Sequence, residues 1–123
     1  MRPVVSRQHL MTETIVLGVT GATVTTSDSS TGLNYGANLA TIKKGVSADS
    51  NLVTITLKHP LGLVPRVLIQ EKTLDCVARL ETTPTRTVIQ IRTMELDGVT
   101  KEDDADFDVY VYGTRELREG DYG

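Results

Sequence analysis

The chain has 123 residues, of which 39% are hydrophobic and 24% charged, and its formal net charge is −3. This length fits one domain and excludes a large multidomain enzyme. With one Phe and no Trp, aliphatic side chains must fill the core, and their mixture with Thr favours strands over helices.

Several function classes are excluded by composition alone. The net negative charge argues against broad binding of nucleic acid. The apolar runs are too short to span a membrane, and the first residues contain no apolar secretion signal. We therefore expect a protein made in a cytoplasm without nucleic-acid or membrane partners. The single cysteine, Cys76, excludes an internal disulfide and a Cys-based zinc site, and we expect it to be buried.

The N-terminal third combines one strand with two polar stretches. Residues 1–12 lack a periodic pattern and are expected to form a tail, whereas residues 13–19 are the first candidate strand. Residues 20–38 are rich in Ser, Thr and Gly and bury too little apolar surface to offset their ordering entropy. We therefore expect an extended arm that neighbouring subunits hold, either exchanged between copies or laid on another protein. Its candidate partner-binding residues are Thr25, Thr26, Leu33 and Tyr35.

The remainder of the chain is predicted to form short strands. Residues 39–44 fit either a strand or a short helical turn. Further strands are predicted at 52–58, 66–70, 76–80, 87–94 and 107–112. Alternation assigns these side chains to the core: Val53, Ile55, Leu57, Ile89, Ile91, Phe107, Val109 and Val111. This spacing, with an Asp-Gly turn at 97–98, predicts an all-β antiparallel sandwich or jelly-roll-like domain over 13–113, followed by an acidic tail at 114–123.

The run His59-Pro60-Leu61-Gly62-Leu63-Val64-Pro65 joins two of these strands. Its two prolines do not donate ladder hydrogen bonds, so the run is expected to turn a corner. Gly62 permits the reversal, and Leu61 and Leu63 are expected to lie beneath it. His59 is expected to fasten the corner by bonding a backbone carbonyl. The predicted corner residues are His59, Gly62 and Pro65.

A strand that ends in His, followed by x-Leu-Gly-x-x-Pro and an aliphatic strand, is similar to a corner in small β-domains of bacteriophage virion proteins. Head decoration (cement) proteins and tail-appendage domains are among them. Here the pattern is carried by His59, Leu61, Gly62, Pro65 and residues 67–69. The resemblance implies an all-β oligomer in a virus particle, without a cofactor. The scarcity of aromatic residues favours decoration of the shell over receptor binding.

Charge is distributed unevenly along the chain. Residues 1–94 hold ten basic and six acidic side chains, whereas residues 95–123 hold three and ten. The densest acidic run, 102–108, is expected to be a solvated loop. One alternative is a surface calcium site, although the EF-hand spacing is absent. Another is pairing with basic side chains of a neighbouring subunit, for which the candidates are Lys43, Lys44, Arg79 and Arg92.

Tyr110 and Tyr112 share the solvent-facing side of the last predicted strand. Paired tyrosines can stack on sugars or anchor a protein interface, because they bury area while keeping a polar tip. Filling a second layer on the sheet is the alternative explanation. No Ser-His-acid set or Gly-rich phosphate cradle is evident, so we expect no enzyme. We accordingly predict no catalytic, cofactor-binding or metal-binding residues, and no small-molecule substrate.

The resulting hypothesis is a non-enzymatic virion protein on the capsid surface. It would form a dimer or trimer, contact the major capsid protein and staple neighbouring capsid subunits. Extended arms and many copies would supply binding strength through multivalency. Two alternatives stay open: a carbohydrate-binding β-domain of a phage tail fibre or spike, and a collar or tail adaptor.

Overall fold

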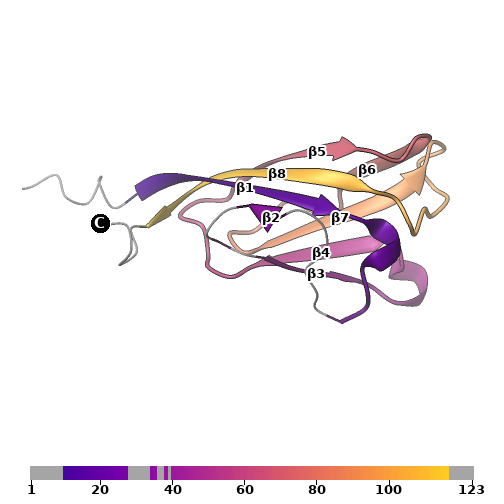
Figure 1. The fold of residues 1–123 in the computed structure, drawn as a ribbon, viewed down its shortest axis with the longest axis horizontal. Coiled ribbons are helices and arrows are strands. Elements are labelled where there is room, and N and C mark those ends of the chain that lie inside the picture. The colour runs from indigo at the N-terminus through magenta and orange to yellow at the C-terminus, as the bar shows by residue number, and fades with distance from the viewer. Residues whose placement is uncertain (1–9, 28–33, 36–37, 39, 117–123) are drawn as a thin grey trace, which may run out of the picture.

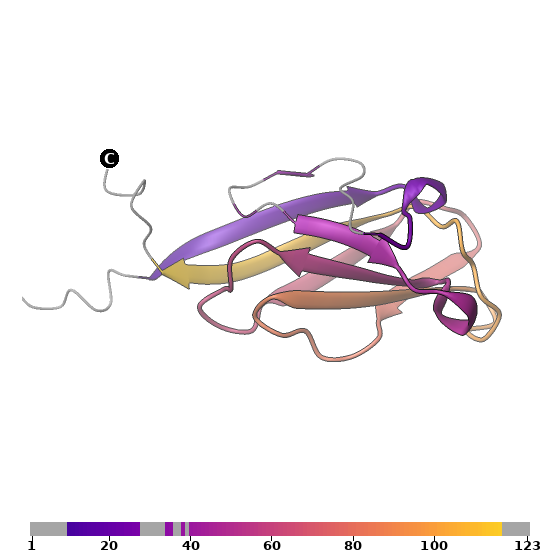
Figure 2. The same cartoon turned by 90° about the horizontal axis from the view of Figure 1, so that it is seen from below.

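In a computed structural model the chain forms two four-stranded antiparallel sheets that pack face to face (Figures 1 and 2). The structure describes residues 10–27, 34–35, 38 and 40–116. The strands are β1 (Leu10–Val19), β2 (Asn34–Tyr35), β3 (Ala40–Lys44), β4 (Leu52–Leu57), β5 (Arg66–Glu71), β6 (Cys76–Leu80), β7 (Val88–Glu95) and β8 (Phe107–Glu116). Two 3-10 turns, η1 (Gly21–Thr23) and η2 (Ser47–Asp49), follow β1 and β3. The predicted all-β antiparallel sandwich is confirmed, and its jelly-roll variant stays a prediction.

The first and the last long strands lie side by side. Sheet A has the order β2-β1-β8-β5, and sheet B has the order β3-β4-β7-β6. β1 pairs with β8 over ten residues, from Leu10 opposite Glu116 to Val19 opposite Phe107. Both strands therefore extend into segments expected to be tails, because each supplies the other with ladder partners. Residues 39–44 likewise become a strand rather than a helical turn, since β3 pairs with β4.

The core fills the space between the two sheets. Strand alternation sends every second side chain inward, so β4 shows a strict alternation of half-buried and buried residues. All eight predicted core side chains are buried. Fully buried side chains from both sheets include Ile15, Leu17, Ile42, Ile55, Ile89, Ile91, Phe107, Val109 and Val111. One Phe and many aliphatic side chains thus build the interior.

The polar segment after β1 is held by its own chain. Val24 is buried and joins the core, although it lies in the Thr-rich stretch. The main-chain N–H of Gly21 donates to Asp106 Oδ1 at 2.9 Å, and the N–H of Lys44 donates to the carbonyl of Thr25 at 2.8 Å. The core and the adjacent loop therefore supply partners for residues 20–27. That neighbouring subunits also hold this segment stays a prediction.

Two later parts of the same segment are also bound within the chain. β2 pairs with β1, placing Tyr35 opposite Val16. Asn38 is fully buried and donates to Glu13 Oε1 at 3.1 Å. The remaining positions, 28–33 with the candidate contact Leu33 and also 36–37, lie outside the described residues. Residues 34–35 and 38, like residues 20–27, therefore contact other parts of the same chain, and an arm laid on a partner stays a prediction.

The corner between β4 and β5 is fastened differently from the prediction. Leu61 is fully buried, but Leu63 is 63% exposed, so only one of the two leucines lies beneath the turn. The N–H of Leu61 donates to the carbonyl of Arg86 at 2.8 Å, and Arg86 Nε donates back to the carbonyl of Leu61 at 2.5 Å. Gly62 N–H donates to the carbonyl of Thr114 at 2.6 Å. The turn is therefore bonded to β8 of sheet A and to the loop that leads into β7 of sheet B.

His59 does not fasten this corner through its imidazole. Its main-chain N–H donates to Asn38 Oδ1, and its carbonyl accepts from Asn38 Nδ2, each at 2.8 Å. Within the described residues the imidazole makes no hydrogen bond. The expected role thus belongs to the backbone of His59 and to Asn38. Pro65 is buried where β5 begins.

Candidate interaction surface

The outer face of sheet A carries the two predicted tyrosines. Since Val109 and Val111 point into the core, Tyr110 and Tyr112 project outward from β8. Across the β5–β8 register, Leu68 lies opposite Tyr110 and Arg66 lies opposite Tyr112. β5 and β8 run side by side along the upper layer in Figure 1. Two neighbouring strands therefore set an aliphatic and a cationic side chain beside the two rings.

Apolar side chains of the corner extend this face. We call the set Leu63, Val64, Arg66, Leu68, Tyr110 and Tyr112 the tyrosine face. Its members include four of the exposed large hydrophobic residues: Leu63, Val64, Leu68 at 60% and Tyr112 at 42% exposure. An apolar cluster of this kind is a recognised sign of an interaction site.

Two shallow hollows adjoin on this face, and Tyr112 lines both. One has a volume of about 430 Å³ and is lined by Leu68, Ile69, Gln70, Tyr110 and Tyr112. The other, of about 360 Å³, is lined by Thr12, Glu13, Thr14, Leu63, Val64, Arg66, Tyr112, Gly113 and Thr114. Their lining combines rings and aliphatic groups with a few polar side chains.

Two polar side chains that line one hollow together with Tyr112, those of Arg66 and Thr114, have unused bonding capacity toward the described residues. Arg66 forms no ion pair with any other described residue. The Thr114 hydroxyl is buried and has no hydrogen-bond partner among the described residues. At the other end of the same sheet, Lys72 and Asp108 neutralise each other at 3.6 Å. The Arg66 guanidinium and the Thr114 hydroxyl, both next to Tyr112, could therefore bond a partner molecule.

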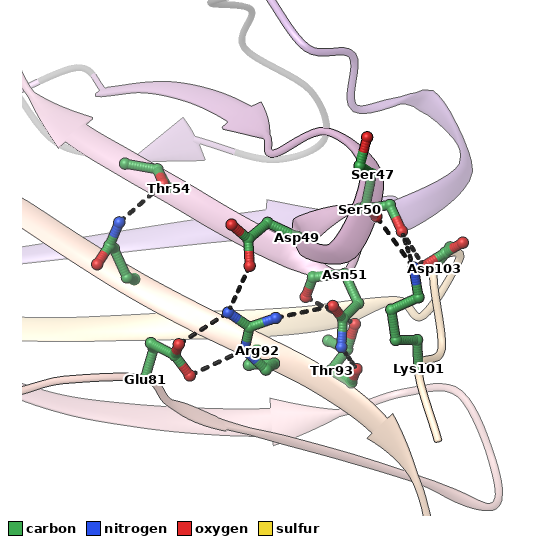
Figure 3. A network of polar contacts seen from close by, with 11 residues as sticks. Ser47, Asp49, Ser50, Asn51, Thr54, Glu81, Arg92, Thr93, Lys101 and Asp103 are labelled. Carbon is green, nitrogen blue, oxygen red and sulfur yellow. Dashed lines mark hydrogen bonds and ion pairs between the residues drawn. The ribbon is translucent and has the colours of Figure 1, made fainter. Parts of the chain in front are cut away.

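On the outer face of sheet B, Arg92 is held by polar contacts within its own chain (Figure 3). Arg92 binds Glu81 with both Nε and Nη2, at 2.9 and 2.7 Å, and binds Asp49 at 3.0 Å. Its Nη1 donates to Asn51 Oδ1 at 3.0 Å. The hydrogen bond from Arg92 lowers the pKa of Glu81, and Glu81 raises the pKa of Arg92. This bidentate pair holds Arg92 within its own chain. The alternative in which Arg92 pairs with a neighbouring subunit stays a prediction.

The acidic loop before β8 is also paired within the chain. Lys44 forms an ion pair with Asp104 at 3.6 Å and donates to the carbonyl of Asp103. Ser50 joins Asp103 to Lys101, as Figure 3 shows. Lys44 thus has partners within the chain, and its pairing with a neighbouring subunit stays a prediction. Among the described residues, no group of three or more His, Cys, Asp or Glu side chains is placed to hold a metal ion.

The structure separates the predicted partner-binding residues. Tyr110 and Tyr112 come together, whereas Thr25 and Thr26 lie in the loop after η1, near the end of β3. Thr25 Oγ1 is engaged locally with Ser27. Lys43 is exposed opposite Thr54, and the Tyr35 side chain lies outside the description. A role in partner binding stays a prediction for Thr25, Thr26, Lys43 and Tyr35.

Sequence reasoning missed Leu68, Arg66, Leu63 and Val64 as members of the tyrosine face. Leu68 stands in the apolar run Val67-Leu68-Ile69, which contains no alternation that would reveal its outward direction. Only its position opposite Tyr110 assigns it to the outer face. The alternation of apolar and other side chains in β8 was visible in the sequence, and it correctly indicated that Tyr110 and Tyr112 face outward.

Cys76 is buried, as predicted. Its Sγ donates to the carbonyl of Thr73 at 3.3 Å. Burial raises the pKa of the thiol, and Glu71 and Glu102 contribute to this rise. The thiol is therefore protonated and weakly nucleophilic at neutral pH. Separately, no helix in the described ranges has the length and apolar character needed to cross a membrane.

Comparison of this chain with known protein families, curated proteins and solved structures finds no match. Its class is therefore defined by architecture: a two-sheet antiparallel β-sandwich with an apolar, tyrosine-bearing outer face on one sheet.

Proposed function

We propose that this chain is a non-catalytic assembly protein that docks onto a protein shell through the tyrosine face. The observation that carries the proposal is the contrast between its two outer surfaces. Sheet A exposes Leu68 and Tyr112 beside Arg66, which forms no ion pair with the other described residues. On sheet B, Arg92 is occupied by partners of its own chain. Aromatic and Arg side chains of this kind dominate the binding energy of protein interfaces.

The corner supports a virion as the setting. The run His59–Pro65 carries the resemblance to bacteriophage virion β-domains, and its Leu63 and Val64 line a hollow of the tyrosine face. The proposed partner is the major capsid protein of a phage head. Decoration would proceed by many equivalent contacts, each modest and together strong through multivalency. The proposed contact does not depend on segments 20–27 and 38, which are bound within the chain.

A second candidate is carbohydrate binding by a tail-fibre domain. Its support is the hollow of about 430 Å³, where two tyrosines lie beside Gln70. Aromatic rings stack on the apolar faces of sugars, and an amide can bond their hydroxyls. A collar or tail adaptor differs from the first proposal in location rather than in mechanism.

Co-sedimentation with purified heads prepared without this chain tests the first proposal. We expect the wild-type chain to pellet with the heads and Tyr112→Ala to lose most of this binding. Leu96→Ala is the matched control, because Leu96 is 66% exposed but lies in the turn after β7. Failure of the wild-type chain to pellet would overturn shell docking. A glycan array on which wild type binds and Tyr112→Ala does not would establish the second candidate instead.

A further inference from the structure

We propose that β5 pairs with β5 of a second copy of this chain, antiparallel and about a two-fold axis at Leu68. This pairing would join the two A sheets into one continuous sheet. It goes beyond shell docking, because it names a different partner and uses the edge of the sheet rather than its face.

The first argument is that β5 is the least protected edge of the sandwich. An open edge strand presents unpaired N–H and C=O groups, and proteins guard such edges by shortness, charge, bulges or cover. β2 has two residues, β6 carries Arg79, and β3 carries Lys43. The N–H of Lys44 in β3 is also bonded to Thr25.

Within the part of the chain that the structure describes, β5 has none of these features in its middle. It spans six residues, pairs with β8 without a bulge, and places its charged residues, Arg66 and Glu71, at its two ends. Between them the sequence is Val67-Leu68-Ile69-Gln70, and Leu68 is 60% exposed. A long, regular edge with an exposed apolar centre is a template for adding a strand.

The second argument is the register. Residues directly opposite each other in a continuous sheet project from the same face, so Leu68 must face Arg66, Leu68 or Gln70 of the second copy. With Leu68 on the axis, the two leucines face each other and Val67 faces Ile69. Arg66 then faces the neutral Gln70. All five rungs are therefore free of like-charge pairs.

The two neighbouring registers are less favourable. Placing Leu68 opposite Gln70 brings Arg66 opposite Lys72, and like charges directly opposite each other are destabilising. Placing Leu68 opposite Arg66 sets an apolar side chain against a charge and shortens the ladder. It also places Pro65, which has no N–H, opposite Ile69. Charge and ladder length thus select the Leu68-centred register.

The pairing has a consequence for the tyrosine face. In each copy Leu68 lies opposite Tyr110. The joined sheet would therefore carry one row formed by Tyr110 and Leu68 of one copy and Leu68 and Tyr110 of the other. Two tyrosine faces would become one surface, which a single chain does not offer.

Cysteine cross-linking of the full chain tests the contact directly. We expect Leu68→Cys to form a disulfide-linked dimer on mild oxidation, because the two residues at the axis would be adjacent. Leu74→Cys is the control: Leu74 is 87% exposed, so collisional oxidation would favour it, but pairing places its two copies far apart. Oxidation of the wild-type chain measures any cross-linking through the native, buried Cys76. Cross-linking of Leu74→Cys as strongly as Leu68→Cys would overturn the proposal.

The register has its own test. Two copies of Arg66→Cys would stand four positions apart, about 13 Å, which exceeds the reach of a disulfide. Arg66→Cys and Gln70→Cys should therefore cross-link when mixed and not when oxidised separately. Efficient cross-linking of either variant alone would contradict the Leu68-centred register.

Sedimentation equilibrium supplies the measurement without cysteines. We expect wild type to approach twice the 13.4 kDa of one chain, and Leu68→Lys to remain at one chain. Leu74→Lys should behave as wild type. A monomeric wild type, or a dimeric Leu68→Lys, overturns the proposed β5 pairing. This outcome is independent of whether the chain binds to heads in the co-sedimentation experiment. Should Leu68→Lys fail to fold, the cross-linking pattern decides.

Discussion

The side-chain amide of Asn38 forms a reciprocal pair of hydrogen bonds with the main chain of His59, at 2.8 Å in each direction. The same Nδ2 also donates to Glu13. One fully buried side chain thus connects the segment before β3, the end of β4 and strand β1. Asn38 therefore anchors part of the segment that composition alone assigns to an arm.

We expect Asn38→Ala to lower the free energy of unfolding by about 2–3 kcal/mol, because it removes the partner of both the N–H and the carbonyl of the half-buried His59. Urea denaturation measures the loss. Thr26→Ala is the control, since Thr26 is exposed and its side chain forms no hydrogen bond with another described residue. Equal stability of the two variants would show that Asn38 does not anchor the segment.

We expect Gly21→Ala to destabilise the fold by about 1–3 kcal/mol, as overpacking of a filled site does. A Cβ at this position would lie within 3.0 Å of main-chain atoms of Asp104 and Ala105, which have little freedom to move. Thermal unfolding with Ala22→Ser as the exposed control measures the effect. A neutral Gly21→Ala would mean that η1 does not press against the acidic loop.

The corner offers a matched pair of leucines. Leu61→Ala should cost about 2–5 kcal/mol, because it opens a cavity in the core, where Leu61 is fully buried. Leu63→Ala should change stability by less than about 0.5 kcal/mol, because its side chain faces solvent. Chemical denaturation of both variants checks the difference. A large loss with Leu63→Ala would place that side chain beneath the turn after all.

The Glu81–Arg92 pair predicts a specific acid sensitivity. The pKa of Glu81 is lowered in the folded chain, so the pair stabilises the fold above the ordinary Glu pKa of about 4.3. That stability is lost as pH falls through the lowered pKa. Wild type should therefore lose up to about 1 kcal/mol more than Glu81→Gln on acidification, a modest amount because Glu81 faces solvent.

Urea denaturation at a series of pH values down to strong acid measures this difference. Glu95→Gln is the control, since Glu95 is exposed and forms no ion pair with the described residues. The expectation fails if wild type and Glu81→Gln lose stability in parallel.

Local alternation made the core faces predictable. Period-two patterns in β4, β7 and β8 require no knowledge of neighbours, because successive side chains of a strand point to opposite faces. They identified the buried side of each strand and, on the other side of β8, Tyr110 and Tyr112. The absence of long helical patterns likewise made the fold class readable from the sequence.

Contacts between distant residues were decided by the tertiary structure alone. The direction of Leu68 depends on its place opposite Tyr110, because three consecutive apolar residues contain no period. Asn38 meets His59 across 21 positions, and Gly21 meets Asp106 across 85. Composition gives the apolar area that a segment can bury. Whether the segment is ordered also depends on the hydrogen-bond and packing partners that the fold brings next to it. Those partners come from distant parts of the sequence, so they are known only from the tertiary structure.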